Sequence, residues 1–146
     1  MSDLQCAATL LLTDAGEGRA LGLSLVDRRI AAIYTSPLPA AVRTAEAVAA
    51  GTGVGVSVRE DLREPLDESG AEVRVRVARE LTALADLHRG ETVLVVSHAG
   101  TLRTGVLPLV GRGDEYAAAH PLPRGAVVEV AADADGWLLR SWAGPD

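Results

Sequence analysis

The fold is decided by the stretch Thr92-Val93-Leu94-Val95-Val96-Ser97-His98-Ala99-Gly100-Thr101-Leu102-Arg103. Its first five residues are β-branched or apolar without alternation, which predicts a strand buried on both faces of a sheet. A helix is expected directly afterwards, over residues 101–110. Open α/β sheets bind ligands where a strand turns into a helix, because free N–H groups and the helix dipole attract anions there. His98 is therefore either a functional histidine or a structural one at a strand end, and the local pattern leaves both open.

Short apolar segments alternate with helical patterns on both sides of this stretch. Further strands are expected over residues 6–12, 30–35 and 54–58, and helices over about 14–28, 40–50 and 70–88. Residues 111–124 read as a polar connection, and a hairpin follows with strands over 126–131 and 137–142. The sequence predicts an α/β protein, a single domain over residues 1–146. Its expected architecture is an α/β sandwich with a mostly parallel central sheet and a C-terminal hairpin.

Composition narrows the classes of function. The 146 residues are 48% hydrophobic and 23% charged, as expected for one globular domain. A net charge of −6 argues against nucleic acid or an anionic membrane as a partner. No signal peptide or membrane-spanning run is evident, so a cytoplasmic protein is expected. One Cys and three scattered His give no metal-ligand spacing, and no dinucleotide or phosphate-loop motif occurs, so neither a metal nor a cofactor is expected.

Several short motifs follow one another in a recognisable order. Leu12-Thr13 with Gly16 comes first, then Tyr34-Thr35-Ser36-Pro37-Leu38 with Arg43-Thr44-Ala45, then Leu62-Arg63-Glu64, and last Val95-Val96-Ser97-His98-Ala99-Gly100 with Arg103. This order resembles the histidine phosphatase superfamily, which has the phosphoglycerate-mutase-like fold. The resemblance implies a three-layer α/β/α sandwich with a mostly parallel central sheet and a C-terminal hairpin. The resemblance runs from about residue 7 to residue 142, and its most specific pieces are the Ser-Pro-Leu segment and the Ser-His-x-Gly strand end.

The resemblance implies a phosphoryl pocket over the strand ends. In the family, the histidine of an Arg-His-Gly motif attacks phosphorus, arginines hold the oxygens, and a second histidine and an acid assist the leaving group. His98 matches the second histidine and Glu64 falls near the acid, so these two are the catalytic candidates. The substrate-binding candidates are Arg43, Arg103, Ser36 and His120.

Each candidate also has a structural interpretation. Glu64 can be a solvated loop charge, and Arg43 and Arg103 can be surface residues of helices. For Ser36 we favour a helix cap at the Ser-Pro step over a catalytic role. His120 lies in a Pro-flanked loop that could fold over the pocket.

The departures from the family pattern concern the chemistry. Where the family has Leu-Val-Arg-His-Gly-Glu, this chain continues from Leu12 into Thr13-Asp14-Ala15-Gly16, so the Arg-His-Gly segment and the loop after it are expected to be missing. Ala40 falls where the family has a phosphate-binding arginine, and Arg43 falls on a glutamine. A Gly-x-x-Glu-Gly stretch and an insertion are also missing after Glu64. Either these loops have been lost or stretches of a longer natural protein are omitted, and the sequence leaves both open.

Three hypotheses follow. The first is a divergent member with an anion-binding cleft at His98 for a small anionic or phosphorylated metabolite. It would lack phosphohistidine-based turnover and be repurposed for acid/base chemistry through His98 and Glu64. The second is an active phosphomonoesterase or mutase whose turnover depends on His98. The third is a non-catalytic interaction module whose shortened loops expose apolar surface to a partner or to a second copy, giving a homodimer. Whether the chain is an enzyme stays open at this point.

Overall fold

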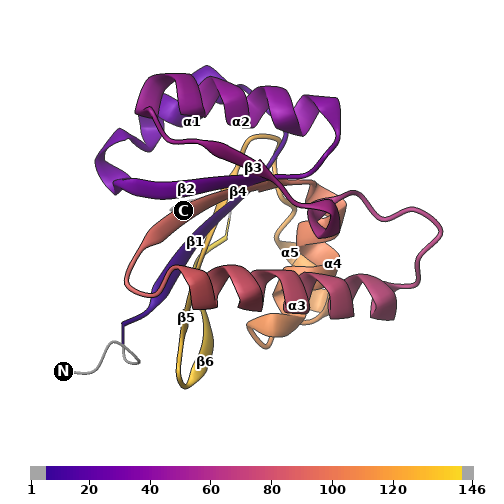
Figure 1. Cartoon of the computed structure of the whole chain (residues 1–146). Helices are drawn as coiled ribbons and strands as arrows, with labels where there is room; N and C mark the ends of the chain where they lie inside the picture. Colours follow the sequence, from indigo (N-terminus) through magenta and orange to yellow (C-terminus); the bar gives the residue numbers. More distant parts are fainter. Residues whose placement is uncertain (1–5, 143–146) are drawn as a thin grey trace.

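One mixed sheet forms the centre of the molecule (Figure 1). The computed structural model describes residues 6–142. The strand order is β3-β2-β4-β1-β5-β6, in which the first four strands are parallel to one another and the last two are antiparallel. The strands are β1 (Ala8–Asp14), β2 (Ile30–Thr35), β3 (Val56–Val58), β4 (Thr92–Ser97), β5 (Val127–Asp133) and β6 (Gly136–Ser141).

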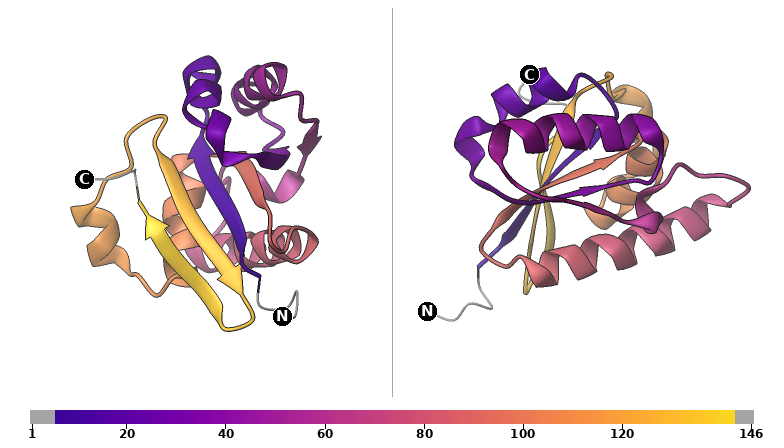
Figure 2. Two further views of the ribbon diagram at one scale, coloured as in Figure 1. Left: turned by 90° about the vertical axis from the view of Figure 1, so that its left-hand side faces the viewer. Right: turned by 45° about the horizontal axis from the view of Figure 1, so that its top comes forward.

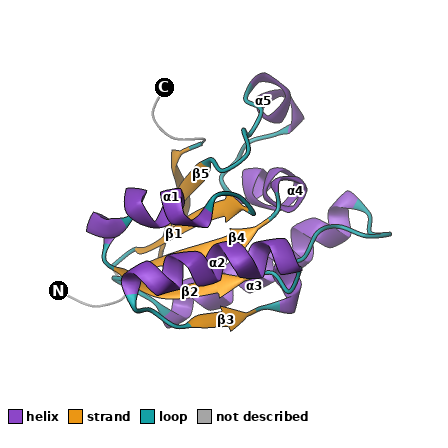
Figure 3. Cartoon of the chain, turned by 90° about the horizontal axis from the view of Figure 1, so that it is seen from above, coloured by secondary structure: helices purple, strands orange, loops and turns teal. Residues whose placement is uncertain are grey.

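Helices cover both faces of the sheet, as Figures 1 and 3 show. On one face lie α1 (Gly18–Ser24), the 3-10 turn η2 (Val26–Arg28) and α2 (Pro39–Thr52). On the other lie α3 (Gly70–Leu87) and α4 (Ala99–Leu109), with the short α5 (Asp114–Ala119) beyond α4 and the 3-10 turn η3 (Glu60–Leu62) before α3. The predicted three-layer α/β/α architecture with a mostly parallel sheet is confirmed.

Two hydrophobic cores hold the layers together. Leu10, Leu12, Val93 and Val95 point into the core under α3 and α4, whereas Leu11, Leu94 and Val96 point into the core under α1 and α2. Because both faces of β1 and β4 are covered, neither strand needs polar positions, which explains their continuous apolar runs. The β5–β6 hairpin lies beside β1 and closes that edge, as the left view of Figure 2 shows.

The first helix is much shorter than predicted. Strand β1 extends to Asp14, which pairs in register with Ser97 of β4, and α1 begins only at Gly18. The prediction of a helix from about residue 14 was wrong because the polar residues that end the apolar run still belong to the sheet. Gly18 then lets α1 pack directly on α2, since a Cβ there would lie 2.7 Å from the carbonyl oxygen of Thr44.

A second difference is α5, which occupies part of the segment predicted as a polar connection. Elsewhere the bounds agree closely: β2 spans the predicted residues, and α3 begins at the predicted Gly70. Ser69 caps α3 by accepting a hydrogen bond from the Glu72 N–H, while the Glu72 carboxylate accepts one from the Ser69 N–H. Within the described residues, no helix has the length and apolarity needed to cross a membrane.

Candidate functional site

His98 lies at the centre of the candidate site, between β4 and α4. It is the N-cap residue of α4, in extended conformation, and is only 8% exposed. Its Nε2 lies 2.8 Å from the hydroxyl oxygen of Ser36, which follows β2 on the neighbouring strand. The backbone N–H of Ser36 in turn donates to the carbonyl oxygen of Val96. Two strand ends therefore fix the imidazole.

Ser36 does not cap a helix, so that prediction was wrong. Helix α2 begins at Pro39 with Leu38 as its N-cap, and Leu38 makes no side-chain cap. The fully buried Ser36 hydroxyl instead accepts a hydrogen bond from the Leu38 N–H at 3.2 Å and contacts His98. Pro39 at the first helical position has no N–H that would need a cap.

Glu64 lies on the other side of the imidazole. Its Oε1 is 3.9 Å from Nδ1 of His98, which is too long for a hydrogen bond, and its side chain is 56% exposed. The loop before it is tied to the start of α4, because Ser97 donates to the Leu62 carbonyl at 2.6 Å and Thr101 to the Arg63 carbonyl at 2.8 Å. The structure thus brings together His98, Ser36 and Glu64.

An open cavity of about 570 Å³ lies over His98 and Glu64, whereas the fully buried Ser36 does not line it. Its apolar wall includes Leu38, Pro39 and Leu122, and its polar groups are Asp14, Glu64, His98 and Arg124. Two carboxylates therefore face one guanidinium. The lining is not cationic, in contrast to the anion-binding cleft expected from the sequence.

Asp14 and Arg124 are the site residues that the sequence analysis missed. Asp14 ends β1, and its Oδ1 accepts a hydrogen bond from the Gly125 N–H at 2.8 Å. Arg124 comes from the Pro-flanked loop before β5, in which Leu122 also lines the cavity. This loop, rather than His120 itself, reaches the pocket.

The end of β1 also corrects our view of the missing motif. Leu12-Thr13-Asp14-Ala15-Gly16-Glu17 aligns without a gap on Leu-Val-Arg-His-Gly-Glu, retaining the Leu, Gly and Glu. Ala15 and Asp14 both line the cavity that contains His98. In this register, Asp14 falls where the family has the arginine and Ala15 falls where it has the histidine. This ungapped match of six residues is the sequence feature from which Asp14 could have been placed in the site.

Arg43, Arg103 and His120 lie outside the lining of this cavity. Arg43 is exposed on α2, and Arg103 is exposed on α4, where it lines a different cavity. His120 follows α5, with its ring stacked on Tyr116 at a centroid distance of 4.0 Å. The structure does not bring these three side chains together with His98.

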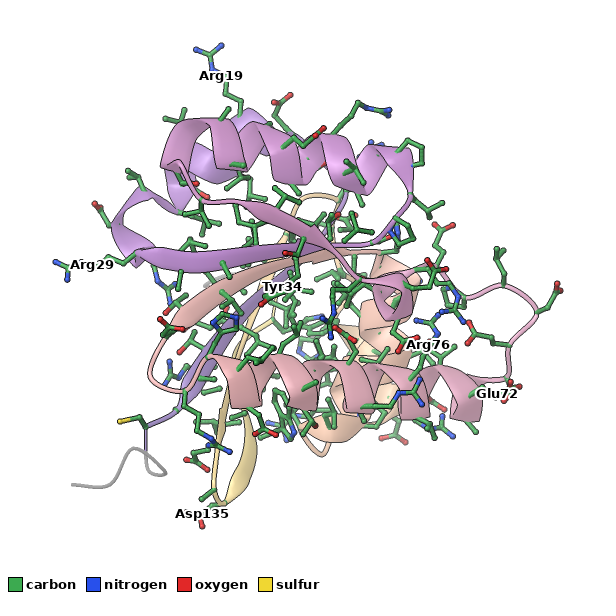
Figure 4. All side chains as sticks on the ribbon, viewed as in Figure 1. Arg19, Arg29, Tyr34, Glu72, Arg76 and Asp135 are labelled. Carbon is green, nitrogen blue, oxygen red and sulfur yellow. The ribbon has the colours of Figure 1, made fainter. Side chains whose placement is uncertain are left out.

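Burial governs the protonation of His98. It lowers the pKa of the imidazole below the ordinary value of 6.5, and the opposing effects of Glu64 and Asp14 only partly offset this. Arg76 adds a smaller lowering of the same pKa. Arg76 is buried on α3, where it donates hydrogen bonds to both carboxylate oxygens of Glu68. Figure 4 shows the contrast with Arg19 and Arg29, which project away from the molecule. His98 is therefore a neutral imidazole at pH 7.

No metal site accompanies the imidazole in the part of the chain that the structure describes. Within residues 6–142, no group of three or more His, Cys, Asp or Glu side chains is arranged to hold a metal ion. The groups that could act on a ligand in this cavity are the neutral imidazole, the two carboxylates and Arg124.

Sequence comparison identifies the family. Residues 5–66 and 65–144 match the histidine phosphatase superfamily (branch 1), so the chain belongs to this superfamily. A comparison with curated protein sequences gave no match.

Solved structures share the fold. YhfR from Bacillus stearothermophilus superposes with a TM-score of 0.84 at 22% identity, over 95% of this chain and 98% of that one. A histidine-to-alanine mutant of phosphoserine phosphatase from Entamoeba histolytica, in complex with phosphoserine, gives 0.82 at 17% identity, over 94% and 97%. Mycobacterial glucosyl-3-phosphoglycerate phosphatase gives 0.76 at 18% identity, over 95% and 100%.

Proposed function

We propose that this protein is a histidine phosphatase superfamily member that binds a small metabolite but has no phosphohistidine-based turnover. The observation that carries the proposal is Ala15, which lines the cavity where the family places its nucleophilic histidine. A methyl group cannot attack phosphorus or hold a transferred phosphoryl group.

The other histidines do not replace the nucleophile. His88 is engaged away from the cavity, with Nε2 2.6 Å from the Tyr34 hydroxyl oxygen and Nδ1 2.8 Å from Glu91. His120 is stacked on Tyr116. Among the described residues that line the cavity, His98 alone carries an imidazole, and a two-histidine mechanism needs a second one.

The charges in the cavity support the same proposal. Phosphoryl transfer depends on fixed cations around the phosphoryl oxygens. Here Asp14 and Ala40 occupy the positions of two family arginines, and Arg124 alone faces two carboxylates. A neutral or singly charged metabolite suits this lining better than a phosphate dianion. The neutral imidazole of His98 beside Glu64 provides the acid/base group for chemistry on such a ligand.

A structural neighbour with one histidine replaced by alanine still binds a ligand. The Entamoeba histolytica phosphoserine phosphatase with a histidine-to-alanine substitution was solved in complex with phosphoserine. In the present chain, the buried His98–Ser36 contact and the two hydrogen bonds from Ser97 and Thr101 hold the pocket in place, which supports ligand binding.

The test is a phosphatase assay on the wild-type protein with p-nitrophenyl phosphate, phosphoserine and 3-phosphoglycerate. We expect no turnover above that of the His98→Ala variant. A second arm rebuilds the family residues by the substitutions Asp14→Arg, Ala15→His and Ala40→Arg. We expect this variant to hydrolyse at least one ester, and to lose that activity when His98→Ala is added.

The competing function is an active phosphomonoesterase, which the fold shared with named phosphatases favours. Wild-type turnover that disappears with His98→Ala would establish it and overturn our proposal. Circular dichroism of each variant keeps a folding defect from being taken for a catalytic one, and the wild-type arm decides the question even if the rebuilt variant does not fold.

A further inference from the structure

A second cavity, of about 430 Å³, lies between α3, α4 and α5. Figure 1 shows α4 and α5 behind the N-terminal half of α3. Arg74 of α3, Arg103 of α4 and Arg112, which follows α4, line this cavity, and Asp114 is its single carboxylate. It shares no lining residue with the cavity at His98. Arg103, which the sequence placed with His98, thus belongs to a separate basic site.

These three arginines differ from the arginines that serve the fold. Arg28 pairs with Glu129 at 2.9 Å and Arg76 with Glu68 at 2.8 Å, so their charge is neutralised within the protein. Within residues 6–142, Arg74, Arg103 and Arg112 make no ion pair and no side-chain hydrogen bond, and Asp114 pairs with none of them. Three guanidinium groups and one carboxylate leave the cavity with excess positive charge.

Two of the guanidinium groups are positioned by contacts other than ion pairs. Arg112 lies over the ring of Tyr116, with its Cζ 5.5 Å from the ring centroid. Arg74 folds back over the first residue of its own helix, since a Cβ on Gly70 would lie 3.4 Å from its Nη1. The same point lies 3.8 Å from a methyl group of Thr104, which neighbours Arg103 on α4. The exposed Arg74 guanidinium therefore lies near the contact between α3 and α4.

We infer that this cavity is a binding site for a small anion that carries two or more adjacent phosphate groups. Guanidinium groups bind phosphate oxygens in pairs of parallel hydrogen bonds, and three of them from different elements suit more than one phosphate. The cavity has the volume of a small-molecule site. A long polyanion is disfavoured because the chain as a whole carries a charge of −6.

The experiment is isothermal titration calorimetry of the full chain with inorganic pyrophosphate, inorganic orthophosphate and citrate. We expect pyrophosphate to bind more tightly than orthophosphate, and binding to weaken as NaCl is raised. Each of Arg74→Gln, Arg103→Gln and Arg112→Gln should weaken pyrophosphate binding by about tenfold, because each removes charged hydrogen bonds to the ligand.

The matched control is Arg43→Gln. Arg43 is also an exposed helical arginine, but it does not line this cavity. It should leave the pyrophosphate affinity unchanged, as should His98→Ala, which separates this inference from the proposed function. Absent pyrophosphate binding, or an equal loss with Arg43→Gln, would overturn the inference. Citrate binding as tightly as pyrophosphate would overturn the assignment to phosphate groups.

Discussion

The carboxyl ends of β1 and β4 lie side by side, in register at Asp14 and Ser97. They differ in how closely their residues match the motifs of the family. The β4 end has the Ser-His-x-Gly residues of the family motif. The β1 end has the leucine, glycine and glutamate of the family motif, with Asp14 and Ala15 at the places of its arginine and histidine.

The two ends are nevertheless tied to the rest of the molecule to a similar degree. At the β4 end, Ser97 and Thr101 donate to the loop carrying Glu64. At the β1 end, Thr13 donates to the Ala126 carbonyl at 2.8 Å, and the Gly16 N–H donates to the Thr44 hydroxyl oxygen at 3.1 Å. The order of the β1 end therefore does not depend on the catalytic residues.

The largest effect on stability is expected at two glycines, one in the helix that follows each strand end, because both helices pack closely on a neighbouring helix at that glycine. A Cβ on Gly105 of α4 would lie 2.5 Å from the Cβ of Val77, and one on Gly18 of α1 would lie 2.6 Å from the Cβ of Ala47. We expect Gly105→Ala and Gly18→Ala each to lower the free energy of unfolding by about 2–3 kcal/mol through overpacking, measured by urea denaturation.

Gly51→Ala is the control for this pair, because nothing lies within 4 Å of a Cβ at this position in α2. It should stabilise the protein by up to about 1 kcal/mol through helix propensity. Tolerance of Gly18→Ala but not of Gly105→Ala would break the comparison, since it would make the β1 end the looser of the two.

A smaller effect on the free energy of unfolding is expected from side chains at the β4 end and the β1 end. The buried Ser97 hydroxyl donates to the carbonyl oxygen of Leu62, so Ser97→Ala leaves a buried acceptor unpaired. We expect a loss of about 1–3 kcal/mol in the free energy of unfolding. Ala15→Ser, at a partly exposed position of the β1 end, should change the free energy of unfolding by less than about 0.5 kcal/mol. Equal losses in chemical denaturation would contradict this contrast.

The sequence was a good guide to the layers because apolar patterning specifies them directly. Continuous apolar runs identified β1 and β4, and the amphipathic pattern identified α3. The pattern failed at α1, where polar residues remain in the sheet, and at α5, whose six residues make too short a pattern to stand out from a loop.

The candidate site was harder to predict, because its geometry depends on segments far apart in the sequence. Motif order placed His98 beside Glu64, and their side chains do meet, at 3.9 Å. The contact between His98 and Ser36 joins residues 62 positions apart, and Arg124 reaches the cavity from a loop without a motif. Arg103 follows His98 closely in the sequence, yet it lines the other cavity, because successive residues of a helix point in different directions.

The smallest expected effect tests whether both strand ends act on the same imidazole. Glu64 raises the pKa of His98, and Asp14 raises it by less, while burial lowers it more strongly than either. Glu64→Gln and Asp14→Asn should therefore each lower the pKa of His98 further, with the larger change for Glu64→Gln. NMR titration of the His98 ring protons measures both. An unchanged pKa in Asp14→Asn would show that the β1 end no longer communicates with His98.

The lowered pKa also sets the sign of a pH dependence of stability. The unfolded chain, with a histidine pKa near 6.5, binds a proton before folded His98 does. As the pH falls from 6.5 to the lowered pKa of the folded state, His98 therefore lowers the free energy of unfolding by a growing amount. Above pH 6.5 this destabilisation is absent. Replacing His98 by Asn should remove this part of the slope, so that wild type and variant differ more in pH dependence below 6.5 than above it. Urea denaturation across this range measures the difference, and parallel curves would mean that the imidazole is as free to take up a proton in the folded pocket as in the unfolded chain.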